Sequence, residues 1–198
     1  PEDIAFIAVT RGPGLAPALE VGLTRAAELG TAWQKPVVGI NHLEGHLWSG
    51  VVQRSTGTGG WEFSASDFPI LGLIVSGGHT EMIWVTSIGE YERLGGTVDD
   101  AFGEAFDKAA RLLGLGYPGG AVLAKLAESG NTTSYTLPRP MRLSGDWNVS
   151  YSGLKTALVR LVEEITGHGE RTLTRPEIQD LAASFQEAAV DTFLYKVG

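Results

Sequence analysis

Two histidines at helical spacing are the residues of this chain best suited to chemistry. His42 and His46 stand four positions apart, in the stretch His42-Leu43-Glu44-Gly45-His46. On a helix this spacing puts both imidazoles on one face, about one turn apart. Two imidazoles placed in this way can bind one metal ion. The spacing therefore predicts metal ligands at His42 and His46, although a pair of surface histidines would look the same.

Two glycine-rich turns follow the histidines along the chain. Gly77-Gly78 comes directly after an apolar run, and Tyr117-Pro118-Gly119-Gly120 precedes a helical pattern. Glycine lets backbone N–H groups come close to an anion, and a helix N-terminus attracts one. Taken singly, each turn is more often a plain hairpin or helix start. Together with the histidine pair, they predict an enzyme that holds a phosphorylated substrate on a metal.

An acidic segment lies between the two turns. Asp100, Glu104 and Asp107 recur at spacings of four and three, which predicts one shared helix face, and Lys108 can pair with Glu104. Carboxylates beside phosphate-binding turns can accept hydrogen bonds from ribose hydroxyls. A solvated acidic helix face is the alternative interpretation.

The histidine pair differs from that of zinc proteases. Those enzymes carry a glutamate directly after the first histidine, where it acts as general base. Here Leu43 has that place, and Glu44 lies about 200° round the helix from His42. The pattern therefore argues against a metalloprotease.

Composition limits the classes of protein. The chain has 198 residues, 43% of them hydrophobic, which allows one large domain or two small ones with a proper core. It contains no cysteine, which excludes disulfides and cysteine-based zinc sites. A net charge of −8 argues against binding nucleic acid by bulk attraction.

A local basic face is nevertheless compatible with this charge. Six cations fall between positions 138 and 175: Arg139, Arg142, Lys155, Arg160, Arg171 and Arg175. These charges could share one basic face, with scattered solvated charges as the alternative.

Hydrophobic periodicity predicts alternating strands and helices, and hence an α/β class. The expected strands are 4–10, 37–40, 70–75, 81–86, 91–97 and 148–152, the third and fourth forming a hairpin. The expected helices are 16–34, one that carries the histidines and is capped by Asn41, 100–113, 121–129, 154–165 and 176–196. A polar glycine-rich loop is expected at 55–60.

Six segments in this order resemble the family of tRNA N6-adenosine threonylcarbamoyltransferases, in its bacterial or mitochondrial branch. They are Val9-Thr10-Arg11-Gly12-Pro13-Gly14-Leu15, Asn41-His42-Leu43-Glu44-Gly45-His46, Val75-Ser76-Gly77-Gly78-His79-Thr80, Asp99-Asp100-Ala101-Phe102-Gly103-Glu104-Ala105-Phe106-Asp107-Lys108, Leu113-Gly114-Leu115-Gly116-Tyr117-Pro118-Gly119-Gly120 and Tyr151-Ser152-Gly153-Leu154-Lys155-Thr156.

The resemblance implies an actin-like ATPase fold of the sugar-kinase and heat-shock-seventy type, with two lobes around a nucleotide cleft. Residues 1–198 would then form a partial domain, truncated at both ends, with the first lobe at about 1–100 and the start of the second at about 101–198. The implied reaction transfers a threonylcarbamoyl group from threonylcarbamoyl-AMP to N6 of the adenosine next to the anticodon, in tRNAs reading ANN codons. A chain cut in this way is expected to be inactive in isolation.

The resemblance also assigns roles to residues. His42 and His46 would hold one divalent metal, Fe²⁺ in the first place and Zn²⁺ as the alternative, with a third ligand outside this chain. The adenylate would be contacted by Ile74, Val75, Ser76, Gly77, Gly78, Asp107 and Gly120. The sequence identifies no general base.

Implied partners are tRNA and either an inactive paralogue with a small ATPase, as in bacteria, or a second copy, as in mitochondria. We expect part of the basic segment 138–175 to face the anticodon stem of the tRNA. No membrane is implied, and the expected location is the bacterial cytoplasm or the mitochondrion. A kinase or ATPase of the same superfamily would share the glycine turns but has no reason to place two histidines ahead of them. A non-catalytic subunit would lack both features.

Overall fold

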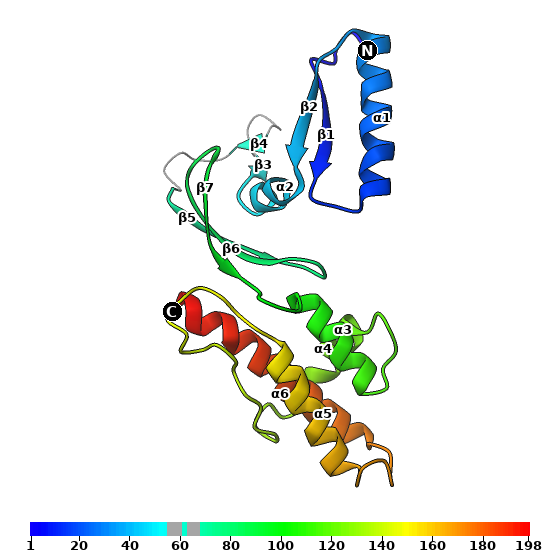
Figure 1. Cartoon of the computed structure of the whole chain (residues 1–198), viewed down its shortest axis with the longest axis vertical. Coiled ribbons are helices and arrows are strands. Elements are labelled where there is room, and N and C mark those ends of the chain that lie inside the picture. Colours follow the sequence, from blue (N-terminus) through cyan, green and yellow to red (C-terminus); the bar gives the residue numbers. More distant parts are fainter. Residues whose placement is uncertain (55–60, 63–67) are drawn as a thin grey trace. The chain divides into compact units, whose positions relative to one another are not determined.

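The chain forms a mixed α/β structure, as the sequence predicts. The computed structural model describes residues 1–54, 61–62 and 68–198, and Figure 1 shows its helices and strands. The chain divides into two compact units, Pro1–Phe68 and Pro69–Gly198. The loop expected at 55–60 lies outside the described residues, and the lobe boundary near residue 100 stays a prediction.

The first unit is built on a β-α-β arrangement. Strands β1 (Ile7–Gly12) and β2 (Val37–Asn41) pair in parallel, as expected for the segments 4–10 and 37–40. Helix α1 (Ala16–Trp33) connects them and lies along the strands (Figure 1). Parallel strands need a crossover of this kind, because the chain must return to the same end of the sheet.

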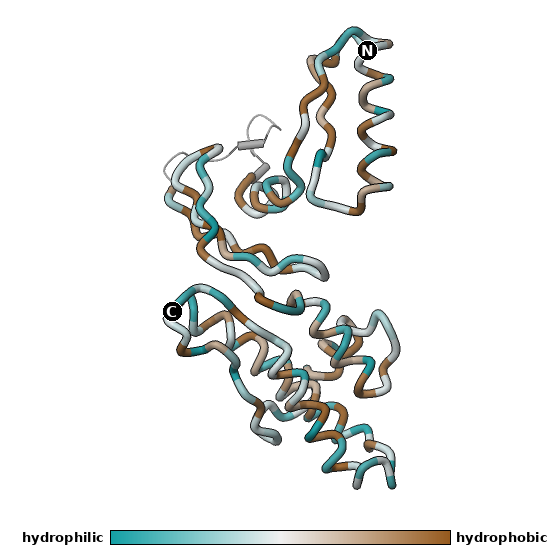
Figure 2. The backbone as a smooth tube through the Cα atoms, in the orientation of Figure 1, coloured by the Kyte–Doolittle hydropathy of each residue, from teal (hydrophilic) through white to brown (hydrophobic). Residues whose placement is uncertain are grey.

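The apolar sequence of segment 4–10 is typical of a buried parallel strand, but the strands of this unit are not enclosed within it. Phe6 is 55% exposed, Val37 43% and Val38 42%, and both strands carry apolar stretches, brown in Figure 2. The few elements of this unit do not enclose the two-stranded sheet on both faces. Apolar strand sequence therefore predicted the pairing correctly but not the burial.

Helix α2 (His42–Ser49) begins directly at the end of β2. The side-chain oxygen of Asn41 accepts hydrogen bonds from the Leu43 N–H at 2.8 Å and the Glu44 N–H at 3.3 Å. Asn41 is thus the N-cap that the sequence predicts. A short antiparallel pair that the sequence did not indicate, β3 (Gln53–Arg54) with β4 (Trp61–Glu62), follows.

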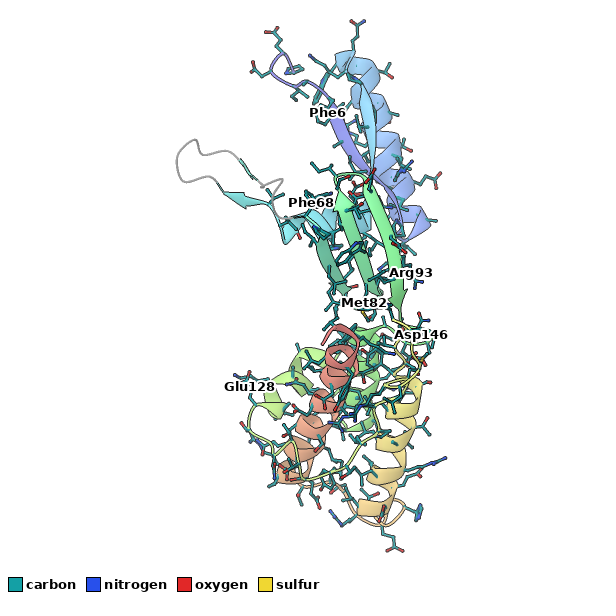
Figure 3. All side chains as sticks on the ribbon, turned by 90° about the vertical axis from the view of Figure 1, so that its left-hand side faces the viewer. Phe6, Phe68, Met82, Arg93, Glu128 and Asp146 are labelled. Carbon is teal, nitrogen blue, oxygen red and sulfur yellow. The ribbon has the colours of Figure 1, made fainter. Side chains whose placement is uncertain are left out.

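The second unit begins with an antiparallel sheet in the order β5-β6-β7. Its strands are β5 (Ile70–Val75), β6 (Thr80–Ser87) and β7 (Glu90–Gly96). The predicted hairpin is confirmed, since Val75 pairs with Thr80 across the intervening turn. Met82, at the end of the sheet next to the helices (Figure 3), is fully buried in the core.

Four helices complete the second unit, close to their predicted bounds. They are α3 (Phe102–Leu112), α4 (Gly120–Ala127), α5 (Ser152–Ile165) and α6 (Arg175–Val197). Thr174 and Glu177 form a capping box at the start of α6. This helix packs against α3, α4 and α5, and its Leu181 and Phe185 are fully buried. In the described part of the chain, no helix has both the length and the apolar character needed to span a membrane.

The strand predicted at 148–152 is wrong in extent. Val149 makes a single parallel bridge with Thr97, and α5 already begins at Ser152. The hydroxyls of Ser150 and Ser152 and the N–H of Tyr151 bind a carboxylate instead of a neighbouring strand. The β-ladder therefore ends after one residue pair.

Asp99 is that carboxylate. It accepts hydrogen bonds from the hydroxyls of Ser150 at 2.5 Å and Ser152 at 2.7 Å, and from the Tyr151 N–H at 2.8 Å. Burial raises the pKa of Asp99, but these donors favour the charged form and together hold the pKa below its ordinary value. The ionised side chain fixes the start of α5.

The core next to these hydrogen bonds to Asp99 contains a hydroxyl that has no hydrogen-bond partner among the described residues. Tyr151 is 0% exposed, and its hydroxyl makes no hydrogen bond within the described residues. Its ring contacts those of Phe102 and Phe193. Burial raises the pKa of Tyr151 above its usual value.

We therefore expect Tyr151→Phe to leave the free energy of unfolding unchanged or to raise it, because an unpaired buried hydroxyl costs roughly 1–3 kcal/mol. Equilibrium urea unfolding measures the change. Tyr151→Ala is the control, and loss of the ring should cost about 3–5 kcal/mol. A destabilisation of more than about 1 kcal/mol in the phenylalanine variant would show that the hydroxyl has a partner.

Candidate functional site

The two predicted metal ligands lie together on α2. The Nε2 atoms of His42 and His46 are 3.2 Å apart, and the ring planes meet at 72°. The Asn41 cap fixes the first turn, so both rings project from a short, defined helix, His42 at its first residue and His46 one turn later. Without a metal, one imidazole can donate to the other at this distance, which keeps the pair assembled.

The histidine geometry fits a shared metal ion. Nitrogens bound to one zinc at about 2.1 Å, with angles from 90° to 109°, lie about 3.0 to 3.4 Å apart. The observed 3.2 Å falls inside that range. Within 1–54, 61–62 and 68–198, no group of three His, Asp or Glu side chains could hold a metal. The described residues therefore offer two potential ligands at this place.

The glycine turn of the second unit is organised by Ser76. Its hydroxyl oxygen accepts from the N–H of Gly78 at 3.3 Å and of His79 at 3.0 Å, and its own N–H donates to the His79 carbonyl at 2.8 Å. A Cβ at Gly77 or Gly78 would meet nothing within 4 Å. No contact with the described part of the chain therefore requires glycine at these two positions.

The start of α3 lies against this turn. The Thr80 hydroxyl accepts from the Phe102 N–H at 2.8 Å, and the Gly103 N–H donates to the Ser76 carbonyl at 3.1 Å. A Cβ at Gly103 would stand 2.8 Å from the Gly77 Cα. Glycine is needed at position 103, because any side chain would push α3 away from the turn.

Asp107 joins α3 to α4. Its Oδ1 accepts from the backbone N–H groups of Gly119 at 3.0 Å and Gly120 at 2.8 Å. These donors stand at the start of α4, where helical N–H groups have no partner within the helix. Oδ2 makes no hydrogen bond within the described residues and remains available to a ligand.

These contacts bring three predicted adenylate residues together. Gly77, Asp107 and Gly120 line one open pocket of about 480 Å³ in the second unit. Its other lining residues come from three helices: Phe102, Gly103, Phe106, Ala121, Ala124, Gln186 and Val190. The volume and the apolar walls suit a small organic ligand.

The remaining predicted contacts lie outside the lining of this pocket. Ile74 is 5% exposed, so its side chain belongs to the core, whereas Val75 is 41% exposed. Ser76 acts by shaping the turn, and Gly78 lies within it. The assignment of these four residues to the adenylate stays a prediction.

Sequence reasoning missed the contribution of α6. Gln186 and Val190 stand one turn apart and complete the pocket wall, and the Gln186 amide makes no hydrogen bond within the described residues. No local signal marks either residue, because the contact arises where α6 packs against α4. The stacked rings of Phe102 and Phe106 also form part of this wall.

The single acidic face expected for Asp100, Glu104 and Asp107 is wrong. Asp100 precedes α3, and with Glu104 it binds Lys108, at 2.5 and 2.9 Å. Lys155 also reaches Asp100, at 3.3 Å. Burial raises the pKa of Asp100, but the two ammonium groups outweigh it and lower the pKa overall. Only Asp107 turns toward the pocket.

Comparison with known proteins agrees with the motifs. The chain matches the family described as TsaD: tRNA N6-adenosine threonylcarbamoyltransferase over residues 1–197. Proteins with that name from Nitrosospira multiformis, Burkholderia thailandensis and Acidovorax sp. are 51%, 49% and 48% identical to it. Each alignment covers 98% of this chain and 53%, 54% and 52% of the relative, respectively.

The chain thus spans about half the length of the curated relatives it matches. The match nevertheless runs almost from its first residue to its last, through the histidine pair, the glycine turn and Asp107. The chain belongs to the tRNA N6-adenosine threonylcarbamoyltransferase family.

Proposed function

We propose that the whole protein transfers a threonylcarbamoyl group from threonylcarbamoyl-AMP to N6 of the adenosine on the 3′ side of the anticodon, in tRNAs that read ANN codons. The pocket that joins Gly77, Asp107 and Gly120 carries this proposal. It combines a glycine turn, a half-satisfied carboxylate and an aromatic wall, which are the features an adenylate needs.

The phosphate would lie at the Gly77 turn and the first turn of α4. The N–H groups of Gly77 and Ala121 donate to no group within the described residues, and both residues line the pocket. An anion at a helix N-terminus is further favoured by the aligned peptide dipoles. The missing side chain at Gly77 lets the phosphate approach the backbone closely.

The nucleoside would occupy the remainder of the pocket. The available Oδ2 of Asp107 can accept from a ribose hydroxyl while Oδ1 keeps the start of α4 in place. Phe102, Phe106 and Val190 offer apolar surface to the purine. The Gln186 amide, with a donor and an acceptor, matches the hydrogen-bonding edge of adenine.

His42 and His46 would hold one divalent ion, Fe²⁺ or alternatively Zn²⁺, which when bound supplies Lewis-acid polarisation of the carbamoyl and carboxylate oxygens. Their 3.2 Å separation supports this assignment. The two positions belong to the first unit and the adenylate contacts to the second.

The reaction places negative charge on the departing AMP. The bond between the carbamoyl carbon and a phosphate oxygen breaks, N6 forms the new carbon–nitrogen bond and loses one proton, and AMP takes the electron pair. No arginine or lysine lines the pocket in the described part of the chain. Backbone N–H groups would therefore stabilise the leaving phosphate without moving during the reaction.

The proposed fold of the whole protein is actin-like, with two lobes around the nucleotide. Its proposed partners are tRNA and either an inactive paralogue with a small ATPase or a second copy. The proposed location is the bacterial cytoplasm or the mitochondrion.

The test uses the full-length protein with threonylcarbamoyl-AMP and unmodified tRNA. We expect one modified adenosine per tRNA by nucleoside mass spectrometry, and one AMP released for each. Phosphate released from ATP, with no modified nucleoside in the presence of the expected partners, would support a kinase or ATPase instead.

Asp107→Asn separates the two roles of this side chain. The amide oxygen can still accept from Gly119 and Gly120, whereas its NH₂ group cannot accept from ribose. We expect calorimetry to show AMP affinity reduced by at least about tenfold, since a hydrogen bond to a charged group contributes about 1.5–3 kcal/mol. Thermal stability should stay near that of the wild type.

Asp107→Ala is the companion variant and should lower both affinity and stability, because it removes the acceptor at α4. If the asparagine variant bound AMP as tightly as the wild type, and only the alanine variant lost stability, Asp107 would be a structural residue.

His42→Ala and His46→Ala should each remove most of the bound iron or zinc from the full-length protein, because a site with three protein ligands that loses one keeps only two. His168→Ala is a matched control, since His168 is exposed and lies outside α2. Elemental analysis provides the readout. Stoichiometric metal in both α2 variants would rule out the histidine pair as the site.

A further inference from the structure

The loop before α5 is fixed to the end of α6 by a buried ammonium group. The side chain of Lys196 is 4% exposed. Its Nζ donates to the carbonyl oxygens of Met141 at 2.7 Å and Asp146 at 2.8 Å, and to the Ser144 hydroxyl at 2.8 Å. We call residues 139–146 the arginine loop. Three acceptors on one cation hold it in a defined conformation.

Asp146 reinforces the loop from within. It accepts from the Ser144 hydroxyl and from the backbone and side chain of Asn148. The hydrogen bonds from Ser144 and Asn148 hold the pKa of Asp146 at about 2, so this carboxylate stays ionised near neutral pH.

The two arginines of the loop have different roles. Arg139 donates to Oδ2 of Asp191 at 2.9 and 2.5 Å, and to the Leu137 carbonyl at 2.8 Å. These contacts use its charge to attach the loop to α6. Within this loop, the expected contact with RNA therefore applies to Arg142 and not to Arg139.

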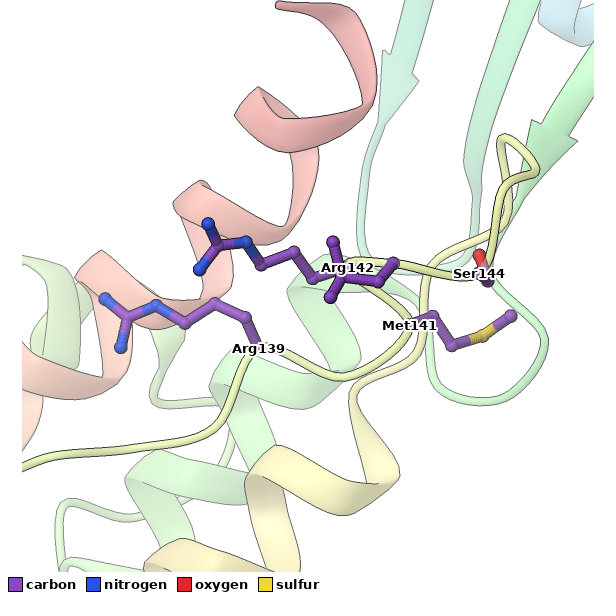
Figure 4. A pocket seen from close by; sticks show the side chains of 5 residues that line it. Arg139, Met141, Arg142 and Ser144 are labelled. Carbon is purple, nitrogen blue, oxygen red and sulfur yellow. The ribbon is translucent and has the colours of Figure 1, made fainter.

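Arg142 is exposed and pairs with no carboxylate within the described residues. Its guanidinium lies 3.6 Å from the centre of the Tyr195 ring, and Tyr195 is 47% exposed. Leu143, next in the chain, is 90% exposed. Figure 4 shows both arginine side chains extending from the loop toward α6, along an open pocket of about 540 Å³.

We propose that Arg142, Leu143 and Tyr195 bind an unpaired stretch of the tRNA substrate. This inference rests on the proposed function, which supplies the RNA. Bases that have left a helix stack on aromatic rings and guanidinium planes, and arginine edges bind phosphate. Arg142 combines both modes, because one face covers the tyrosine while its N–H groups and second face remain accessible.

Two other basic residues of the segment are already paired. Lys155 binds Asp100, and Arg171 binds Glu177 at 2.6 Å. The surface is therefore one cation with apolar and aromatic neighbours, rather than a basic stripe. Such a surface should make a small electrostatic contribution and a larger stacking contribution to RNA binding.

The experiment measures tRNA affinity of the full-length protein, with the partners it needs, over a range of KCl concentrations. Arg142→Gln should weaken binding about tenfold at low salt and reduce the salt slope by about one phosphate contact. Tyr195→Leu should weaken it about fivefold or more with an unchanged slope. AMP affinity should stay at the wild-type value in both variants.

Arg160→Gln is the matched control. Arg160 is exposed on α5 and makes no ion pair within the described residues, so its loss should leave tRNA affinity unchanged. Melting temperatures should show that all three variants fold.

Wild-type tRNA affinity in both Arg142→Gln and Tyr195→Leu would overturn the inference while leaving the proposed function intact, provided that modified nucleoside still forms. Loss of a protein partner in these variants, with direct tRNA binding preserved, would also overturn it and identify a protein interface. If the wild-type protein with its partners made no modified nucleoside, the proposed function itself would fail.

Discussion

The architecture of the pocket depends on one close backbone contact, between the first turn of α3 and the glycine turn after β5. The Gly103 N–H donates to the Ser76 carbonyl, and position 103 has no room for a Cβ. Thr80 secures the same junction by capping α3, and its side chain is 1% exposed. Because α3 starts there, Asp107, about one and a half turns along the helix, reaches the start of α4.

A second consequence of this junction is electrostatic. Asp107 places a carboxylate at a helix N-terminus, where it offsets part of the positive end of the dipole. Only one of its oxygens bonds there, so the same group can organise backbone donors and accept from a ligand. The pocket thus presents donors and an acceptor without a basic side chain among the described residues that line it.

Local features of this fold could be predicted well from the sequence. Contacts between distant segments could be predicted only where the motifs matched those of a known family. The Asn41 cap, the hairpin around Ser76 and the helix α1 follow from residue type and periodicity. The Gln186 contribution could not be predicted, because it depends on how α6 packs on α4. The segment 148–152 misled for a related reason, since the side chain of Asp99, about 50 residues earlier in the chain, satisfies its polar groups.

The histidine pair shows where spacing is sufficient. An i, i+4 pair on a capped helix has little freedom, so the sequence predicted the juxtaposition and the structure supplied the 3.2 Å separation. Asp100 and Glu104 have the same spacing, but Lys108 binds both of them. Spacing predicts a site only when no nearby partner of opposite charge claims the side chains.

Helix α6 carries residues of both proposed binding surfaces in the second unit. Gln186 and Val190 face the pocket, whereas Asp191, Tyr195 and Lys196 hold the arginine loop. With a rise of about 1.5 Å per residue, Tyr195 lies about 7.5 Å beyond Val190 along the helix axis and about 140° round it. The two surfaces therefore share one rigid element but no side chain. A change that displaces α6 would disturb both surfaces. Shortening one exposed side chain would disturb only the surface to which that side chain belongs. Single side-chain substitutions can therefore separate adenylate binding from RNA binding.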